Sequence, residues 1–129
     1  MKIVYNVDEY IDDLMKLYEN EWWTNKRKKE DVIKMLQNTT YVFGIVQNNN
    51  LIAFSRVLSD KVYKALIFDV IVHKNYRGLG LGEKIIKTIL NHHELKKVKT
   101  IELYCKEEMV SFYEKFGFRK VDDLVFLKR

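Results

Sequence analysis

The chain of 129 residues has no proline, only five glycines and a single cysteine, Cys105. One cysteine excludes an intrachain disulfide and is typical of proteins from a reducing compartment. No apolar run approaches the roughly 20 residues that a membrane-spanning helix needs. The first residues run straight into an acidic stretch rather than into the apolar core of a signal peptide. We therefore expect a cytoplasmic protein without a membrane partner.

Length and composition limit the classes of protein that fit. The length suits a single domain covering residues 1–129, and 47% apolar with 13% aromatic residues argues against disorder. The net charge of +5 raises nucleic-acid binding as one function. The basic residues are dispersed, however, and the densest cluster, Lys26–Lys29, is followed at once by Glu30 and Asp31, as at a solvated helix start. We expect no nucleic-acid partner; the same charge suits a polyanionic cofactor.

Hydrophobic periodicity alternates between strand and helix along the chain. Asn6 can cap the first helix, and Asn48–Asn50 predicts a hairpin turn because asparagine tolerates left-handed backbone. The expected strands are Lys2–Tyr5, Tyr41–Gln47, Leu51–Leu58, Ala65–Val72, Thr100–Cys105, Phe118–Val121 and Leu124–Lys128. The expected helices are Val7–Tyr18, Lys29–Gln37, Leu81–Asn91 and Glu107–Phe116. The order β-α-α-β-β-β-α-β-α-β-β predicts an α/β fold, a mixed sheet with helices on both faces.

Three of the five glycines lie in one loop, at positions 78, 80 and 82, between a predicted strand and a predicted helix. A helix start leaves about four backbone N–H groups unpaired and carries roughly half a positive charge. Glycines let the backbone approach a phosphate closely, and Arg77 adds a permanent positive charge. A dinucleotide fingerprint would need glycine in place of Glu83 or Ile85, and the Gly-Lys-Ser/Thr end of a Walker A loop is absent. The spacing favours a pyrophosphate site that needs no metal over a plain flexible turn.

Two motifs together resemble the GNAT acetyltransferase superfamily. Arg77-x-x-Gly80-x-Gly82 is similar to the R/Q-x-x-G-x-G/A acetyl-CoA motif of that family. Residues 111–118, Ser-Phe-Tyr-Glu-Lys-Phe-Gly-Phe, resemble its F-Y-E-K-x-G-F helix end, and a helix and a strand separate the two motifs as in the family. The resemblance covers Leu51 to Phe118. It implies a GNAT-like acyl-CoA N-acyltransferase fold, acetyl-CoA as the co-substrate and an amine as the acceptor.

The resemblance also implies roles for particular residues. Tyr113 is the expected general acid near the thioester sulfur. The strand that holds Val70, Ile71 and Val72 is expected to splay from the strand at 100–105 and to pair its backbone with the pantetheine arm. The expected pyrophosphate contacts come from Arg77, Gly78, Leu79, Gly80, Leu81, Gly82 and Glu83. Expected contacts with the acceptor amine come from Trp22, Trp23, Phe68 and Tyr104.

The general base is not evident from the sequence. Leu66 and Phe68 occupy the strand positions that face the substrate, where some relatives carry histidine or glutamate. Asp69 has the opposite parity unless a β-bulge reverses it. Glu102 and His73 are more distant candidates, so a water chain to bulk solvent is the leading hypothesis. A small-molecule amine is the favoured acceptor, and a homodimer is left open.

The remaining polar residues receive structural predictions, and two other functions stay open. We expect Arg56 to form a surface ion pair, with contact to an anionic substrate as the alternative. We expect Cys105 to lie buried in a strand rather than to act as a nucleophile, and His92 and His93 to end a helix without binding a metal. The first competing function is a catalytically degenerate acetyl-CoA-binding regulatory module. The second, nucleic-acid binding, leaves the clustered glycines without a role.

Overall fold

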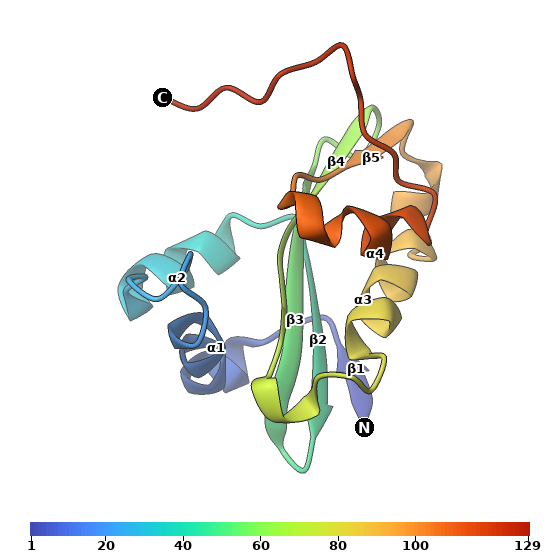
Figure 1. Ribbon diagram of the computed structural model, residues 1–129. Helices are drawn as coiled ribbons and strands as arrows, with labels where there is room; N and C mark the ends of the chain where they lie inside the picture. Colours follow the sequence, from blue (N-terminus) through green and yellow to red (C-terminus); the bar gives the residue numbers. More distant parts are fainter.

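The computed structural model describes all 129 residues and contains one five-stranded mixed sheet in the order β1-β2-β3-β4-β5 (Figure 1). The strands are β1 (Lys2–Val4), β2 (Tyr41–Gln47), β3 (Asn50–Ser59), β4 (Lys64–Val72) and β5 (Thr100–Glu102). The helices are α1 (Ile11–Glu19), α2 (Lys29–Gln37), α3 (Leu81–Leu90) and α4 (Val110–Glu114). Pairing is antiparallel from β1 to β4 and parallel between β4 and β5, which confirms the predicted mixed sheet.

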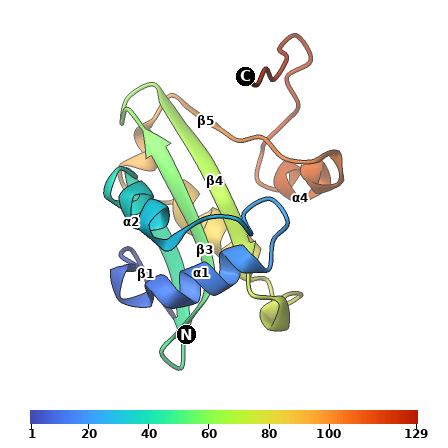
Figure 2. The same cartoon turned by 90° about the vertical axis from the view of Figure 1, so that its left-hand side faces the viewer.

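Helices cover both faces of the sheet, as the sequence predicts (Figure 1, Figure 2). On one face, Leu14 of α1 and Val32 of α2 belong to a buried cluster with Phe54 of β3. On the other face, α3 packs Ile85 and its neighbours into a second cluster with residues of β2, β3 and β4. Two cores form because successive side chains of a strand point to opposite faces of the sheet. None of the helices has the length and apolar character needed to cross a lipid bilayer.

The turn between β2 and β3 has the conformation that its asparagines predict. Asn48 and Asn49 have φ values of 52° and 63°. Positive φ at both central residues suits the twist of a tight hairpin. By contrast, two helices begin later than predicted, because a 3-10 turn at Asp8–Tyr10 precedes α1 and another at Glu107–Met109 precedes α4.

A β-bulge interrupts the pairing of β3 with β4. Phe68 and Ile71 of β4 pair with positions 56 and 54 of β3, so Asp69 and Val70 together lie opposite the single residue Ser55. Asp69 has a φ of 55°, which is uncommon for a residue other than glycine. The Ser55 hydroxyl donates a hydrogen bond of 2.9 Å to the carbonyl oxygen of Phe68 and so satisfies the bulged backbone.

The bulge shifts the alternation of β4 side chains by one residue, so that even-numbered positions face one side of the sheet before it and the other side after it. Before it, Ala65 and Ile67 pack toward α3; after it, Val70 and Val72 do so. Asp69 therefore joins the face that α1 and α2 cover, where Tyr18 contacts it. The sequence predicted that Asp69 would share a face with Phe68 only if a β-bulge reversed its orientation, and the structure contains that bulge.

β4 and β5 pair at only three positions, from Lys64 with Thr100 to Leu66 with Glu102. β5 ends there, whereas β4 continues to Val72, and the two segments diverge (Figure 2). The predicted strand over Thr100–Cys105 was therefore too long. Its last three residues leave the sheet, and the outer backbone edge of β4 after Leu66 has no neighbouring strand.

The predicted C-terminal hairpin is wrong. Residues 118–129 contain no strand, and the side chains of Val125 and Leu127 are exposed. Figure 1 shows this segment leading away from α4. A two-stranded hairpin is marginally stable by itself, and the edge strand β5 offers only three residues with which to pair.

Candidate active site

The loop before α3 presents a row of free backbone donors. Gly78 and Gly80 both have a φ of 80°, a left-handed conformation that residues with a Cβ rarely adopt. Lys84 is the first residue to donate a helical hydrogen bond, to the carbonyl oxygen of Gly80. The N–H groups of residues 78–83 have no acceptor within the protein. Such a row at the positive end of a helix dipole suits an anion.

Arg77 contacts protein groups on both sides of this loop. Its Nε donates to the carbonyl oxygen of Val72 at 3.1 Å, and an Nη donates to the Glu21 carboxylate at 2.6 Å. Glu21 belongs to the segment between α1 and α2, so the ion pair fastens that segment to the glycine loop. Arg77 would have to leave Glu21 in order to give both Nη groups to a phosphate.

Helices α3 and α4 meet near the last residue of β4, six residues beyond its last pairing with β5. A Cβ added to Gly82 would lie 3.4 Å from the Phe112 ring and 3.9 Å from a methyl of Val72. The small residue at position 82 therefore lets the first turn of α3 pack closely on both neighbours. This packing brings the first turn of α3 and helix α4 to the end of β4 that has no neighbouring strand on its outer side.

Tyr113 of α4 is buried in the core cluster that also contains Leu81 and Ile85 of α3. Its ring packs edge-on against Phe112, with centroids 5.0 Å apart, and against Phe118 at 6.1 Å. Burial, and to a smaller extent Cys105, raises the pKa of the Tyr113 phenol to about 12. At neutral pH this side chain is a hydrogen-bond donor and very rarely a phenolate.

Cys105 does not lie where the sequence predicts. It is exposed and outside any strand, because β5 ends at Glu102. Partial burial and the carboxylate of Glu107 raise the pKa of its thiol. A thiol with a raised pKa is a poor nucleophile, so the prediction that Cys105 is not the nucleophile agrees with this environment.

Aromatic side chains lie on the sheet face that α1 and α2 cover. Phe68 of β4 and Tyr104, just beyond β5, form an edge-to-face pair with ring centroids 5.9 Å apart. Lys106 places its ammonium 4.1 Å from the centroid of the Trp22 ring. Trp22 and Trp23 are 67% and 42% exposed. The structure thus brings Trp22 to the segment after β5 that also carries Tyr104, whereas no aromatic or cation contact joins Trp23 to it.

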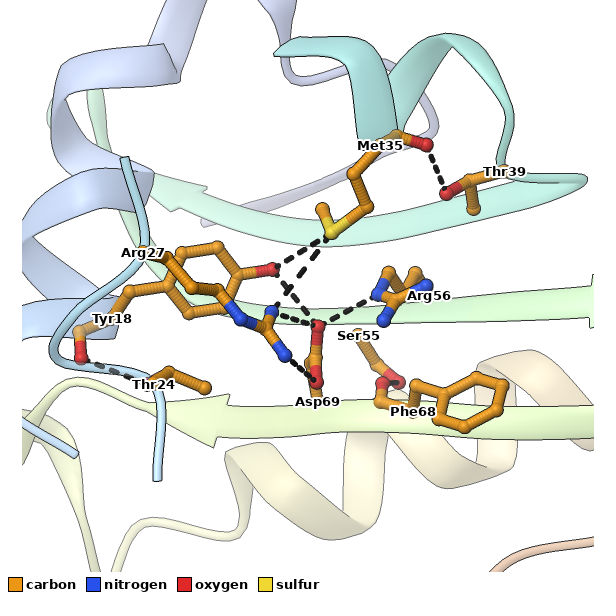
Figure 3. A network of polar contacts seen from close by, with 9 residues as sticks. All are labelled: Tyr18, Thr24, Arg27, Met35, Thr39, Ser55, Arg56, Phe68 and Asp69. Carbon is orange, nitrogen blue, oxygen red and sulfur yellow. Dashed lines mark hydrogen bonds and ion pairs between the residues drawn. The ribbon is translucent and has the colours of Figure 1, made fainter. Parts of the chain in front are cut away.

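A buried cluster of charged side chains lies on the same face (Figure 3). The Asp69 side chain, 4% exposed, accepts hydrogen bonds from Arg27 at 2.7 and 3.4 Å, from Arg56 Nε at 2.7 Å and from the Tyr18 hydroxyl at 3.0 Å. Burial alone would raise the pKa of Asp69, but the two arginines hold it below its usual value. Burial raises the pKa of Tyr18, so its hydroxyl remains a donor.

Two expectations about polar residues change with this cluster. Arg56 is not a surface residue, because its side chain is only 14% exposed and its partner Asp69 is buried. Arg27, which the sequence showed only as part of a basic run, joins the cluster from the segment between α1 and α2. The apolar neighbours of Asp69 in β4 were the one available signal, since a carboxylate within a buried strand needs a charged partner.

The other candidates for a general base are engaged in local interactions. Glu102 accepts hydrogen bonds from Lys64 and Thr100, and these lower its pKa. His73 accepts a hydrogen bond from the N–H of Asn75 at its Nδ1. No group of three histidine, cysteine, aspartate or glutamate side chains is placed to hold a metal ion.

Comparison with known proteins identifies the class to which this fold and loop belong. The sequence pattern of the acetyltransferase (GNAT) domain matches residues 8–128. Over 122 residues the chain is 33% identical to the uncharacterized N-acetyltransferase ycf52 of Pyropia yezoensis, a match that covers 92% of this chain and 68% of the relative. The chain therefore belongs to the GNAT acetyltransferase family and is an N-acetyltransferase.

The chain is also similar to one solved structure over its whole length and to one further sequence relative over part of its length. The GNAT family acetyltransferase SP0256 of Streptococcus pneumoniae TIGR4 superposes with a TM-score of 0.80 at 21% identity, over 99% of this chain and 98% of that one. Serotonin N-acetyltransferase 2, chloroplastic, of Oryza sativa subsp. japonica is 34% identical over 74 residues, which are 57% of this chain and 37% of that protein.

Proposed function

We propose that this protein transfers an acetyl group from acetyl-CoA to a primary amine, with a small-molecule amine as the favoured acceptor. The observation that carries the proposal is the row of free N–H groups at residues 78–83, which follows a strand that has no neighbouring strand on its outer side beyond Leu66. The diphosphate of coenzyme A accepts from the loop, and the pantetheine arm pairs with the backbone of Val70, Ile71 and Val72. The thioester then lies in the opening between β4 and β5.

The reaction in this proposal is a direct attack of the neutral amine on the thioester carbonyl, with both substrates bound. The bond from nitrogen to the acetyl carbon forms, the carbon–sulfur bond breaks, and the amine proton ends on the thiol or in solvent. A backbone N–H near Val70 stabilises the oxyanion, and one such donor is worth ~3 kcal/mol. Fixing the two reactants side by side contributes up to ~7–11 kcal/mol.

Tyr113 acts on the leaving thiolate as a hydrogen-bond donor. With a tyrosine pKa of about 12 and a thiol pKa near ~8.5, full proton transfer is uphill by about 3.5 pKa units, or roughly 5 kcal/mol. Donating a hydrogen bond avoids most of this cost. A later transfer to the sulfur, relayed from the nitrogen that is protonated in the tetrahedral adduct, completes the proton balance.

In this proposal solvent takes the proton from the acceptor's ammonium group before the neutral amine attacks. Asp69 and Glu102 have lowered pKa values and are held by basic side chains, which makes both of them weak bases. A simple alkylammonium has a pKa near ~10.4, so a small neutral fraction reacts at pH 7. The rate should therefore rise with pH up to the pKa of the bound acceptor.

The proposal also covers the domain, the co-substrate and the cellular location. Residues 1–129 act as one domain, with acetyl-CoA as a co-substrate and no metal. A cytoplasmic location stays a prediction, because the name of the related rice protein describes that protein as chloroplastic. The residues proposed to border the acceptor are Trp22, Trp23, Phe68 and Tyr104.

A catalytically degenerate acetyl-CoA-binding module is the second candidate, favoured by the lack of a free general base. A thiol-release assay with acetyl-CoA and an amine panel separates the two functions, with mass spectrometry of the products. Serotonin belongs in the panel, since a relative is named for it. We expect amine-dependent release of coenzyme A and an acetylated product. Coenzyme A binding without any acetylated amine would favour the regulatory module.

A further inference from the structure

The buried cluster around Asp69 carries an excess of positive charge on the acceptor side of the sheet. One carboxylate faces two guanidinium groups, those of Arg27 and Arg56, and the third partner, Tyr18, is neutral (Figure 3). A buried ion pair is normally balanced, because an uncompensated charge away from water is costly. One positive charge of this cluster therefore lacks a partner within the protein.

The two arginines differ in the donors that they leave free. Arg27 directs both of its Nη groups at Asp69. Arg56 donates to Asp69 through Nε alone, and its two Nη groups have no acceptor within the protein. Neither Nη is among the fully buried atoms that lack a partner, so both keep some contact with solvent although the side chain is only 14% exposed.

The fork of Arg56 lies beside the residues proposed to border the acceptor. Arg56 pairs in register with Phe68 on β4, and its guanidinium carbon is 4.9 Å from the centroid of that ring. Phe68 in turn meets Tyr104 across the opening between β4 and β5. A guanidinium and two aromatic rings thus follow one another across the sheet face, ending where the thioester is proposed to lie.

We propose that the acceptor amine carries an anionic group, a carboxylate or a phosphate, which accepts hydrogen bonds from the two Nη groups of Arg56. Two parallel N–H donors match the paired oxygens of these anions. The body of the acceptor lies along Phe68 and Tyr104, and its amine reaches the opening. This inference rests on the proposed acetyl transfer and assigns Arg56 the choice of substrate.

The Asp69 interaction prepares Arg56 for this role. Asp69 fixes the Nε edge of the guanidinium, and the Phe68 ring lies against the group, so the outer edge is held in one orientation. Little side-chain freedom remains to be lost when an anion binds. Lysine at this position would keep the charge but would have no fork to share between Asp69 and a ligand.

The test compares amines that differ only in the anionic group. The pairs are phosphoethanolamine with ethanolamine, glucosamine 6-phosphate with glucosamine, and phenylalanine with phenethylamine. We expect the wild-type kcat/KM to favour the anionic member of at least one pair by tenfold or more. The phosphate and carboxylate pairs show which anion is preferred. No preference in any pair would overturn the inference.

Variants of the two arginines separate recognition from folding. Arg56→Lys should reduce the preference to within about threefold, whereas Arg27→Lys, which alters the same cluster without touching the fork, should keep it. The preference is a ratio within one protein sample, so a loss of folded protein cancels. An undiminished ratio in Arg56→Lys would contradict the proposed role.

Failure of this inference and failure of the proposed function give different results. Turnover of the neutral amines with no anionic preference removes Arg56 from recognition and leaves acetyl transfer standing. If no amine is acetylated, calorimetric titration of coenzyme A-saturated protein with the same pairs decides. Binding of an anionic member that Arg56→Lys loses supports the inference, and no binding of any member overturns it.

Discussion

Replacing Asp69 with asparagine tests whether the charged cluster stabilises the packing of α1 and the segment after it on the sheet. Asparagine has nearly the same shape as aspartate and tolerates positive φ as well, so the backbone conformation at 55° is kept. The substitution removes only the negative charge. Arg27 and Arg56 then remain close together without their carboxylate.

The expected loss of stability follows from the burial of the three groups. Breaking a buried ion pair by removing one partner costs about 3–5 kcal/mol. The Asp69 side chain is 4% exposed, but Arg27 is 30% exposed and gains some hydration, which favours the lower limit. We expect Asp69→Asn to lower the free energy of unfolding by about 3 kcal/mol, which corresponds to a melting temperature about 10 °C lower.

Urea unfolding, followed by circular dichroism, measures this change. Asp12→Asn is the matched control, because it breaks an exposed pair with Lys29 and should change stability by less than about 1 kcal/mol. A loss below about 1 kcal/mol in Asp69→Asn, with an unchanged slope against urea, would refute the account of the cluster. Such a result would mean that hydration stabilises the positive charges of Arg27 and Arg56 once the carboxylate is removed.

The difference between wild type and Asp69→Asn should also depend on pH. The pKa of Asp69 is lower in the folded state than in the unfolded chain, where aspartate titrates near ~3.9. Its contribution to stability is therefore fully present above about pH 5 and is lost as the pH falls through the folded pKa. The two proteins should approach each other in stability below about pH 4.

Two further predictions concern the chemistry and the glycine loop. Tyr113→Phe should lower kcat about 10- to 100-fold, the worth of a hydrogen bond to a charged group, and change KM for acetyl-CoA less; an unchanged kcat would remove Tyr113 from the chemistry. Gly80→Ala should weaken coenzyme A binding, because alanine disfavours a φ of 80° and shifts the N–H groups. Gly117→Ala is its control, since Gly117 also has positive φ and an open Cβ position but lies outside the loop; equal losses of coenzyme A affinity in both variants would contradict a specific role of the loop.

Local chemistry predicts those parts of the fold that local interactions decide. Asn48 and Asn49 specify their own turn, and the apolar periodicity of Lys29–Gln37 reproduces α2 from end to end. The predicted C-terminal hairpin also has two apolar segments joined by a turn, but a strand forms only when it pairs with a neighbouring strand. Its failure depends on the length of β5, which no residue within 118–129 encodes.

The charged cluster shows what the sequence leaves open at the site. The parity of Asp69 depends on a bulge that involves Ser55 on another strand, so β4 alone does not fix it. Arg27 is 42 residues from Asp69, within a run of four basic residues that look alike in the sequence. The glycine loop was accessible to prediction because the function proposed for it depends on consecutive backbone groups.

Calorimetric titration with coenzyme A, and in parallel with pantetheine, tests the central claim most directly. If the N–H groups of residues 78–83 hold the diphosphate, coenzyme A binds saturably and pantetheine, which lacks the diphosphate, binds at least tenfold more weakly. Absence of coenzyme A binding would contradict the proposed function. Equal affinity for the two compounds would show that the glycine loop is not the anchor.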